Sequence, residues 1–365
     1  MRFFYPVLLT VVAVARNSPA QSDAGAFAGE NFWKTTGKHV GSAACAACHP
    51  AQSKTYAETT MQRALTRITE VAPLPGNVDY TWREKNIAYR IQRVGPRLMY
   101  RVTNGTETLE TPLLYSFGEG MAGMTFVYER NGQYYESRVS YYAELRGLDL
   151  TVGSTPARDE DLTRLAGRAM NPQDARECFG CHTTGARNGK TFQLVSYEPG
   201  VRCENCHGPG GDHVAAKSAG TIRSWKGLDA QDMSDACGAC HRTWEKVLWM
   251  GVKGEDNVRF APYRLTMSKC FAADDARIGC TACHDPHAKL ETVTAKYDGK
   301  CLACHANGIG TTPLKAGLKA GAKACPKANS DCASCHMPKV SPPGTHHAFV
   351  DHRIRIARKD GIYPE

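Results

Sequence analysis

Long apolar runs are scarce in this sequence of 365 residues. One short run covers residues 3–15, after Met1-Arg2 and before the small residues at 17–20, and no later window holds 18 apolar residues. A membrane-spanning helix needs about 20 such residues, so no transmembrane anchor is expected in the mature chain. The short run is typical of a signal peptide over residues 1–20, the alternative being a buried N-terminal helix. No cysteine follows the run, so a lipoprotein anchor is not expected, and the mature protein should be exported and soluble.

Cysteine, by contrast, is abundant: the 16 cysteines are far more than an ordinary cytosolic enzyme carries. Seven segments share the pattern C-x-x-C-H, of which composition alone predicts roughly 0.03. Their paired cysteines are Cys45 and Cys48, Cys178 and Cys181, Cys203 and Cys206, Cys237 and Cys240, Cys280 and Cys283, Cys301 and Cys304, and Cys332 and Cys335. The histidines that end the segments are His49, His182, His207, His241, His284, His305 and His336.

This pattern is the attachment signature of c-type haem. Two intervening residues let one helical turn present both thiols to the vinyl groups of one porphyrin edge, and the next residue, His, then faces the iron as its proximal ligand. Zinc ribbons also use C-x-x-C pairs, but they do not need a His after every pair. The sequence therefore predicts seven covalently attached haem c groups.

Two cysteines, Cys270 and Cys325, stand outside the motifs. In an oxidising compartment they could form a disulfide that ties the region of the fifth motif to that of the seventh. The alternative is a pair of buried thiols, and the sequence leaves this choice open.

The formal net charge is +9, part of which comes from Arg2 and Arg16 in the predicted signal peptide. A basic chain could bind nucleic acid or anionic lipid. Seven haems, however, bring about fourteen propionates, and Arg matches a carboxylate through two parallel hydrogen bonds. We therefore expect the basic residues to pair with propionates, and we expect no nucleic-acid partner.

The motifs are unevenly distributed. The first stands alone at residues 45–49, and the other six are crowded into residues 178–336, where porphyrin faces are expected to replace an ordinary core. The predicted fold class is a multihaem cytochrome c of mostly short α-helices and loops wrapped around a haem chain, with a small antiparallel β insert. The predicted parts after the signal peptide are an N-terminal single-haem segment (21–76), a β-rich insert (77–155) and a six-haem domain (156–365).

The insert, around residues 78–152, contains neither Cys nor His and is rich in Tyr, Val, Thr and Arg. Strands are expected at 88–94 and 97–102 around Gly95-Pro96, and at 124–129 and 133–139 around Asn131-Gly132, a strong hairpin signal. The insert is either a scaffold that shields haem edges or a docking surface for a partner. Helices are expected at residues 50–69, 159–170 and 245–250.

Each low-spin haem also needs a second axial ligand, usually His or Met. The 13 histidines leave six outside the motifs: His39, His213, His287, His346, His347 and His352. At least one of seven haems therefore has another ligand or an open face. His213 and His287 follow their own motifs too closely to bind the same iron, so each is expected to reach a neighbouring haem. His346 and His347 are adjacent, so only one of them is expected to bind iron. For His39, His213, His287 and His352 the alternative is a surface position without a ligand role.

Met61 is the best candidate for the remaining site. It lies on the helix expected after His49, where a Met usually serves core packing, but the shortage of histidines favours a ligand role. A haem with His and Met ligands has a higher potential than one with two His, which would make the first haem a terminal for electron entry or exit. Met337 adjoins a proximal His and is expected to pack near its own haem.

Several stretches resemble the cytochrome c554-type multihaem family, which is described by its cytochrome c-552/4 domain. They are His39–His49 followed by Thr60-Met61, Cys203–His207 followed by Gly-Pro-Gly and His213, Cys280–His284 followed by Asp285-Pro286-His287, and Cys332–Lys339 with Asp351-His352-Arg353-Ile354 downstream. The resemblance implies that relatives carry a His, as the distal haem ligand, at the position that Met61 occupies here. The resemblance implies packed haem pairs in a continuous chain.

The wider group also contains nitrite reductases and hydroxylamine oxidoreductases, but no C-x-x-C-K occurs here, so the usual nitrite-reductase active haem is missing. The leading hypothesis is a non-catalytic electron carrier or conduit in the periplasm or at the cell surface, which exchanges electrons with redox partner proteins. The first alternative is an enzyme that reduces or oxidises a small nitrogen or sulfur compound at one open haem. The second is a subunit of an extracellular cytochrome filament, in which a C-terminal histidine ligates a haem of another copy of the chain.

Overall fold

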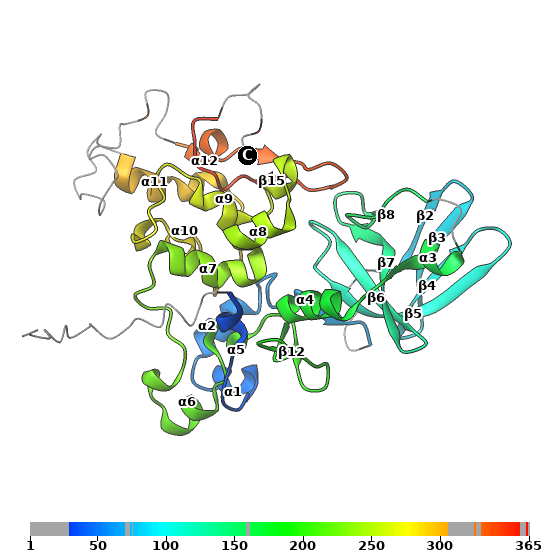
Figure 1. Ribbon diagram of the computed structural model, residues 1–365, viewed down its shortest axis with the longest axis horizontal. Coiled ribbons are helices and arrows are strands. Elements are labelled where there is room, and N and C mark those ends of the chain that lie inside the picture. Colours follow the sequence, from blue (N-terminus) through cyan, green and yellow to red (C-terminus); the bar gives the residue numbers. More distant parts are fainter. Residues whose placement is uncertain are drawn as a thin grey trace, which may run out of the picture.

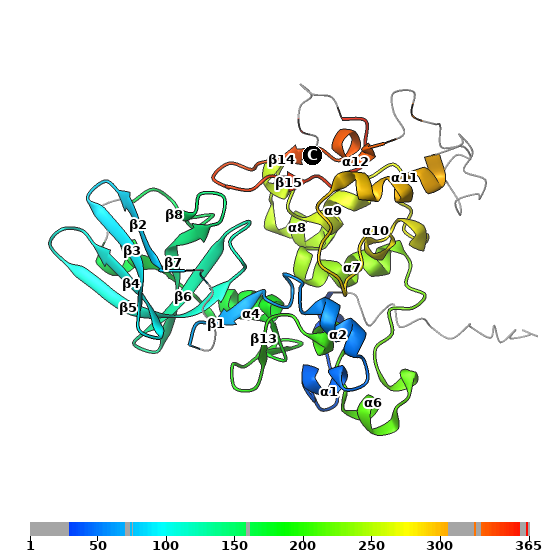
Figure 2. The ribbon, with the colours of Figure 1, turned by 180° about the vertical axis from the view of Figure 1, so that it is seen from behind.

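The computed structural model describes residues 29–69, 74, 76–157, 161–305, 325, 330–357 and 363. The predicted signal peptide, residues 1–20, lies outside the described residues. Figure 1 shows two lobes, one of short helices and one of strands, and Figure 2 shows the same two lobes from behind. In the part of the chain that is described, none of the helices has the length and apolar character needed to cross a membrane.

The β-rich lobe is one antiparallel sheet of nine strands. Seven strands follow one another in sequence order: β2 (Asp79–Glu84), β3 (Ile87–Val94), β4 (Arg97–Thr103), β5 (Thr108–Phe117), β6 (Met124–Arg130), β7 (Gln133–Tyr142) and β8 (Gly147–Leu150). Two short strands from outside the predicted insert, β1 (Leu65–Arg67) and β9 (Gly167–Ala169), pair with β5 and β7. Because β2 also lies against β8, the sheet curls into a nearly closed barrel. Breaks in register along β5–β6 and β6–β7 provide the bends that closure needs.

The barrel encloses a hydrophobic core of its own. Along β3 every second side chain is buried, as expected for a strand with one face inward. The helix α3 (Leu162–Ala166) covers this core, and the buried hydroxyls of Tyr89 and Tyr100 donate hydrogen bonds to the carbonyls of Leu165 (3.1 Å) and Ala166 (2.7 Å). Both polar tips are thereby satisfied inside an apolar core.

The expected fold class is therefore wrong in the relative amounts of helix and strand that it assigns to the protein. The described residues are 24% strand and 33% helix, and the barrel is too large to be a small insert in a mostly helical protein. The expectation assigned the core to porphyrin faces, whereas the alternating side chains of this segment are sufficient to build a second core without haem. The two predicted hairpins are confirmed: β3 turns into β4 at Gly95-Pro96, and Arg130 pairs with Gln133 across the turn between β6 and β7.

The other lobe consists of short helices. They are α1 (Ser42–Ala46), α2 (Pro50–Tyr56), α4 (Pro172–His182), α5 (Cys203–His207), α6 (Gly211–Ala216), α7 (Ala230–His241), α8 (Trp244–Met250), α9 (Ala261–Thr266), α10 (Cys280–Cys283), α11 (Asp298–His305) and α12 (Cys332–His336). The 3-10 turns are η2 (Gly29–Trp33), η3 (Ala219–Thr221), η4 (Gly254–Asn257), η5 (Ala276–Ile278) and η6 (Thr294–Tyr297). Three two-stranded ladders pair β10 (Thr183–Thr184) with β13 (Glu198–Pro199), β11 (Arg187–Asn188) with β12 (Thr191–Phe192), and β14 (Lys339–Val340) with β15 (Phe349–Val350).

The helix α4 joins the two lobes. It begins at a capping box in which the Asn171 side chain accepts a hydrogen bond from the backbone N–H of Asp174, and the Asp174 carboxylate accepts one from the backbone N–H of Asn171. The buried ring of Phe179 packs edge-on against Tyr115 and Phe117 of the barrel, with ring centres 5.1 Å apart in both cases. The second C-x-x-C-H motif, which ends this helix, is thus set directly against the barrel.

Candidate haem-binding sites

Each of the seven motifs lies on or beside a short helix. Six coincide with the ends of α4, α5, α7, α10, α11 and α12, and the first runs from the end of α1 to His49, the N-cap residue of α2. The backbone N–H of His49 donates to the carbonyl of Cys45 at 2.9 Å, and that of His284 donates to the carbonyl of Cys280 at 3.0 Å. One helical turn thus carries both thiols and the histidine, which is the arrangement that covalent haem attachment requires.

Thiols of different motifs lie near one another, close enough for one thiol of each pair to shift the pKa of the other. The pairs are Cys45 with Cys203, Cys181 with Cys240, Cys237 with Cys280, and Cys301 with Cys332. These contacts join the first motif to the third, the second to the fourth, the fourth to the fifth and the sixth to the seventh. Motifs that are far apart in the sequence therefore meet in space.

Three histidines outside the motifs face a motif histidine. The ring centres of His49 and His213 lie 6.3 Å apart, those of His207 and His287 lie 6.0 Å apart, and those of His284 and His352 lie 6.2 Å apart. An imidazole nitrogen binds a metal at about 2.0–2.1 Å and the ring centre lies about 1.1 Å beyond it, so two rings on opposite sides of one ion have centres roughly 6.3 Å apart. The residues of each pair therefore fit an iron between them.

The second ring nitrogen of several of these histidines is held by a backbone carbonyl. Among the motif histidines, Nδ1 lies 2.8 Å from the carbonyl oxygen of Ala64 in His182, 3.2 Å from that of Arg223 in His207, and 2.8 Å from that of Arg355 in His336. Outside the motifs, Nδ1 lies 2.9 Å from the carbonyl oxygen of Ser218 in His213 and 3.0 Å from that of Val350 in His352. A carbonyl only accepts hydrogen bonds, so Nδ1 carries the proton and Nε2 keeps its lone pair. This arrangement is typical of histidines that bind a metal through Nε2.

Burial also favours the neutral form of four candidate ligands. Burial and the neighbouring His284 lower the pKa of His352 to about 4. Burial likewise lowers the pKa of His182, His207 and His284 below the ordinary value of histidine. Neutral imidazole is the form that binds a metal, so these environments favour ligation over a positive charge.

Three of the other candidate ligands lie in different surroundings. His39 is 38% exposed, and its Nδ1 lies 3.6 Å from a carboxylate oxygen of Glu204. Met61 lies beyond the end of α2, because the predicted helix over residues 50–69 ends at Tyr56 and the chain then turns toward β1. The ring of His347 packs edge-on against Phe349, with centres 4.9 Å apart.

His346 contacts the barrel. Its Nε2 lies 2.8 Å from a carboxylate oxygen of Asp149, and its ring packs edge-on against Tyr142 with centres 4.6 Å apart. The nitrogen that would bind iron is therefore engaged by a carboxylate, and the side chain fastens the C-terminal region to β7 and β8.

The structure does not join Cys270 to Cys325 by a disulfide. Cys270 is partly buried, whereas Cys325 is exposed. The alternative of two buried thiols therefore describes Cys270 better than Cys325.

Sequence reasoning missed Glu204, which lies inside the third motif. This residue is 2% exposed, and its carboxylate accepts hydrogen bonds from the backbone N–H groups of Val40 (2.9 Å), Gly41 (2.8 Å) and Gly210 (2.7 Å). It ties the segment that leads into the first motif to the third motif. The available signal was an acidic side chain between two haem-binding cysteines, where a charge needs a partner.

Comparisons with known proteins agree with these motifs. The model of the family "Cytochrome c554 and c-prime" matches residues 153–208. Over 191 residues the chain is 26% identical to the multiheme cytochrome MtrA of Shewanella baltica, covering 49% of this chain and 50% of that protein. Over 134 residues it is 31% identical to cytochrome c-554 of Nitrosomonas europaea, covering 32% of this chain and 55% of that protein.

A third relative is the high-molecular-weight cytochrome c of Nitratidesulfovibrio vulgaris, 30% identical over 151 residues, which cover 40% of this chain and 24% of that protein. The chain thus spans about half, or less, of the length of the curated relatives it matches. Among solved structures, the outer cell wall cytochrome OcwA has a similar fold, with a TM-score of 0.52 and 16% identity over 87% of this chain and 79% of that chain. The predicted resemblance to cytochrome c554-type multihaem cytochromes c is thereby confirmed, with the family's own match confined to residues 153–208.

Proposed function

We propose that this protein is a multihaem c-type cytochrome that transfers electrons along seven covalently bound haems, one at each C-x-x-C-H motif. The observation that carries the proposal is the set of three histidine pairs with ring centres 6.0–6.3 Å apart. Each pair joins a motif histidine to a histidine outside the motifs, as two axial ligands of one iron require. Haem c supplies reversible one-electron exchange at its iron when bound.

The three pairs support specific ligand sets. We infer His49 and His213 for the first haem, His207 and His287 for the third, and His284 and His352 for the fifth. In each set the second ligand follows a later motif: the third, the fifth and the seventh, respectively. Ligands exchanged in this way lock distant parts of the chain together, and they explain how a lobe of short helices holds its shape.

Residues around each axial histidine are expected to set the reduction potential of its haem. Burial, nearby charge and hydrogen bonds to the axial histidines are the means by which a protein sets haem potentials. The thiol contacts between motifs support close spacing of neighbouring attachment points, which electron transfer along a chain needs. His39, Met61 and His347 are the candidates for second ligands at the histidines of the second, fourth, sixth and seventh motifs.

We place the protein in the periplasm or at the cell surface, in exchange with redox partner proteins. The support is the predicted signal peptide, together with relatives whose names describe multihaem cytochromes and a structural neighbour described as an outer cell wall cytochrome. The curved outer face of the barrel then either shields haem edges or receives a partner.

Intact-mass measurement and low-temperature EPR of the air-oxidised holoprotein test the proposal together. We expect a mass increase of seven haems and low-spin signals for at least the three haems with paired histidines. A holoprotein with fewer haems than motifs, or one that exchanges no electrons with any redox mediator, would falsify it.

A second candidate function is reduction or oxidation of a small nitrogen or sulfur compound at an open haem. The observation that favours it is the contact of His346 with Asp149, which removes one histidine from a supply that is already too small. A high-spin EPR signal that shifts on adding nitrite, hydroxylamine or cyanide would support this function. Seven low-spin signals that ignore all three compounds would exclude it.

A further inference from the structure

One short segment, residues 351–355, contacts two of the proposed haem sites. Within it, His352 faces His284 with ring centres 6.2 Å apart. Three positions later, the carbonyl of Arg355 accepts a hydrogen bond from Nδ1 of His336 at 2.8 Å, and the backbone N–H of Arg355 donates to the carbonyl of His336 at 3.1 Å. The same five residues therefore supply the second ligand at the fifth motif and orient the ligand of the seventh.

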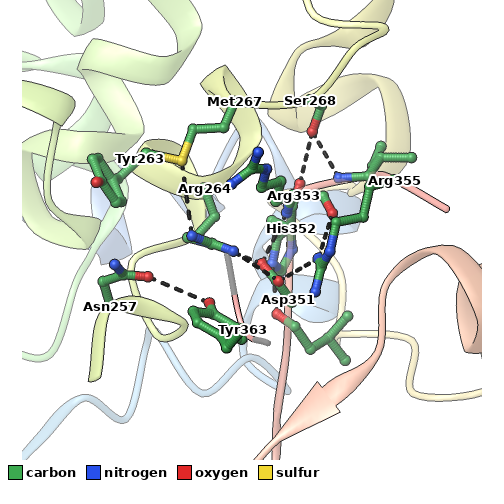
Figure 3. A network of polar contacts seen from close by, with 12 residues as sticks. Asn257, Tyr263, Arg264, Met267, Ser268, Asp351, His352, Arg353, Arg355 and Tyr363 are labelled. Carbon is green, nitrogen blue, oxygen red and sulfur yellow. Dashed lines mark hydrogen bonds and ion pairs between the residues drawn. The ribbon is translucent and has the colours of Figure 1, made fainter. Parts of the chain in front are cut away.

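A buried ion pair pins this segment to α9 (Figure 3). Arg264 and Asp351 are both 0% exposed, and Nε and Nη2 of Arg264 each donate to a carboxylate oxygen of Asp351 at 2.9 Å. The backbone N–H of Arg353 (3.0 Å) and Nη1 of Arg355 (2.5 Å) donate to the same carboxylate. Four donors thus fix the orientation of Asp351, which directly precedes His352.

Two further contacts hold the same region. The Ser268 hydroxyl, two residues beyond the end of α9, donates to the carbonyl of His352 (3.0 Å) and accepts from the backbone N–H of Ile354 (2.8 Å). The ring of Tyr363 lies over the guanidinium of Arg264 at 4.5 Å. Figure 3 shows these groups gathered around His352 from both sides.

The arrangement is better suited to positioning than to stability. Taking two charges out of water offsets most of their attraction, so an apolar pair of the same size would stabilise the fold at least as well. The planar fork of an Arg on a carboxylate, by contrast, fixes direction in a way that an apolar contact does not. Here the fork spans 87 positions of sequence and ends one residue from His352.

We propose that Arg264 and Asp351 are positioning residues for two axial histidines at once, His352 at the fifth-motif haem and His336 at the seventh. The inference rests on the proposed function, because it requires iron at both sites. Without the ion pair, His352 moves away from His284. His336 then also loses the carbonyl that makes its imidazole a stronger donor to a metal.

The test compares the wild-type holoprotein with R264K, R264M and D351N by low-temperature EPR and an optical redox titration. R264K keeps the charge but loses the fork, so it carries the test even where R264M fails to accumulate as holoprotein. We expect each variant to change two of the seven haems and to leave the other five as in wild type. One of the two becomes high-spin, and the other stays low-spin with a raised potential, because its histidine has become a weaker donor.

Two controls separate positioning from simple destabilisation. R138M breaks the corresponding pair in the barrel, where Arg138 and Glu84 are 8% and 14% exposed and 3.2 Å apart, and it should lower the unfolding temperature with no change at any haem. H352A should turn one haem high-spin and leave the His336 haem unchanged.

The possible outcomes are distinct. If R264K and R264M leave all seven haems as in wild type, or change them no more than R138M does, the positioning role is wrong. If H352A leaves every haem low-spin, His352 is not an axial ligand and the proposed ligand set itself fails. A change at one haem in H352A and at two haems in R264K supports the proposal.

Discussion

At the scale of single residues, candidate iron ligands differ in which ring nitrogen of the histidine is already engaged by a neighbouring residue. His213 uses Nδ1 to donate to the carbonyl of Ser218, so its Nε2 is available to face His49. His346 instead places Nε2 against the carboxylate of Asp149. Two histidines that the sequence treats alike therefore have different surroundings.

This difference predicts different effects of the same substitution. We expect H213A to remove the second ligand of the first haem, so that about one haem in seven becomes high-spin and binds cyanide. H346A should leave the EPR spectrum unchanged and should cost about 1–2 kcal/mol of unfolding free energy, because Oδ2 of Asp149 loses its histidine partner. EPR with and without cyanide, and thermal unfolding, measure the two effects.

Comparing H213A with H346A also decides which of the two histidines is an iron ligand. A high-spin haem in H346A, with H213A unchanged, would contradict both roles and would make His346 a ligand. Unchanged spectra in both variants would show that neither histidine binds iron.

At the scale of elements, the β6–β7 hairpin shows which local features a sequence specifies reliably. Asn131 and Gly132 have φ values of 53° and 76°, so both central residues adopt the positive φ that a tight two-residue hairpin turn requires. Asn and Gly tolerate this conformation better than other residues do. The turn therefore follows from two adjacent residues and needs no tertiary contact.

We expect G132V to destabilise the barrel by about 2 kcal/mol, since a β-branched residue is strained at positive φ. A Cβ at this position meets no atom within 4 Å, so the cost comes from the backbone alone. N131G keeps the positive φ accessible and should change stability by only a few tenths of a kcal/mol. Denaturant unfolding followed by tyrosine fluorescence measures both, and equal stability of G132V and wild type would contradict the expected turn.

The helix expected at residues 50–69 shows the opposite case. Local pattern favours a helix, but the structure ends it at Tyr56 because residues 65–67 pair with β5 as β1. The hydroxyl of Tyr56 donates to the carbonyl of Val201 at 2.7 Å, which anchors the end of the helix to a segment 145 residues away. Contacts over such distances override helix propensity and are invisible to local pattern.

At the scale of the whole molecule, net charge gives a prediction that involves every haem. The chain carries +9, whereas seven haems would add about fourteen propionate charges and return one positive charge per ferric iron. We expect the oxidised holoprotein to focus near neutral pH and the reduced one at acidic pH. Isoelectric focusing of both forms, with the haem-free chain as a basic control, measures this directly. A holoprotein that focuses as basic as the haem-free chain would mean few haems or unpaired basic residues.

The balance between the two lobes was the main feature that the sequence did not reveal. The haem motifs favour a helical wrapper, and the pattern of residues 78–152 predicts hairpins of a small insert but not a barrel. Closure depends on the contact of β2 with β8 and on register breaks within β5–β7, none of which has a local signature. Strand pairing is a long-range property, so recognising hairpins does not give the barrel.

The sequence by itself determined the chemistry of attachment, because C-x-x-C-H needs only one helical turn to bring two thiols and a histidine together. It also determined the shortage of second ligands, which is a matter of counting. Only the tertiary structure decided which histidine faces which, since His213, His287 and His352 each meet a motif other than the one they follow. It alone brought Arg264 to Asp351 across 87 residues. These choices depend on how distant segments pack, and packing is fixed by the whole chain rather than by any stretch of it.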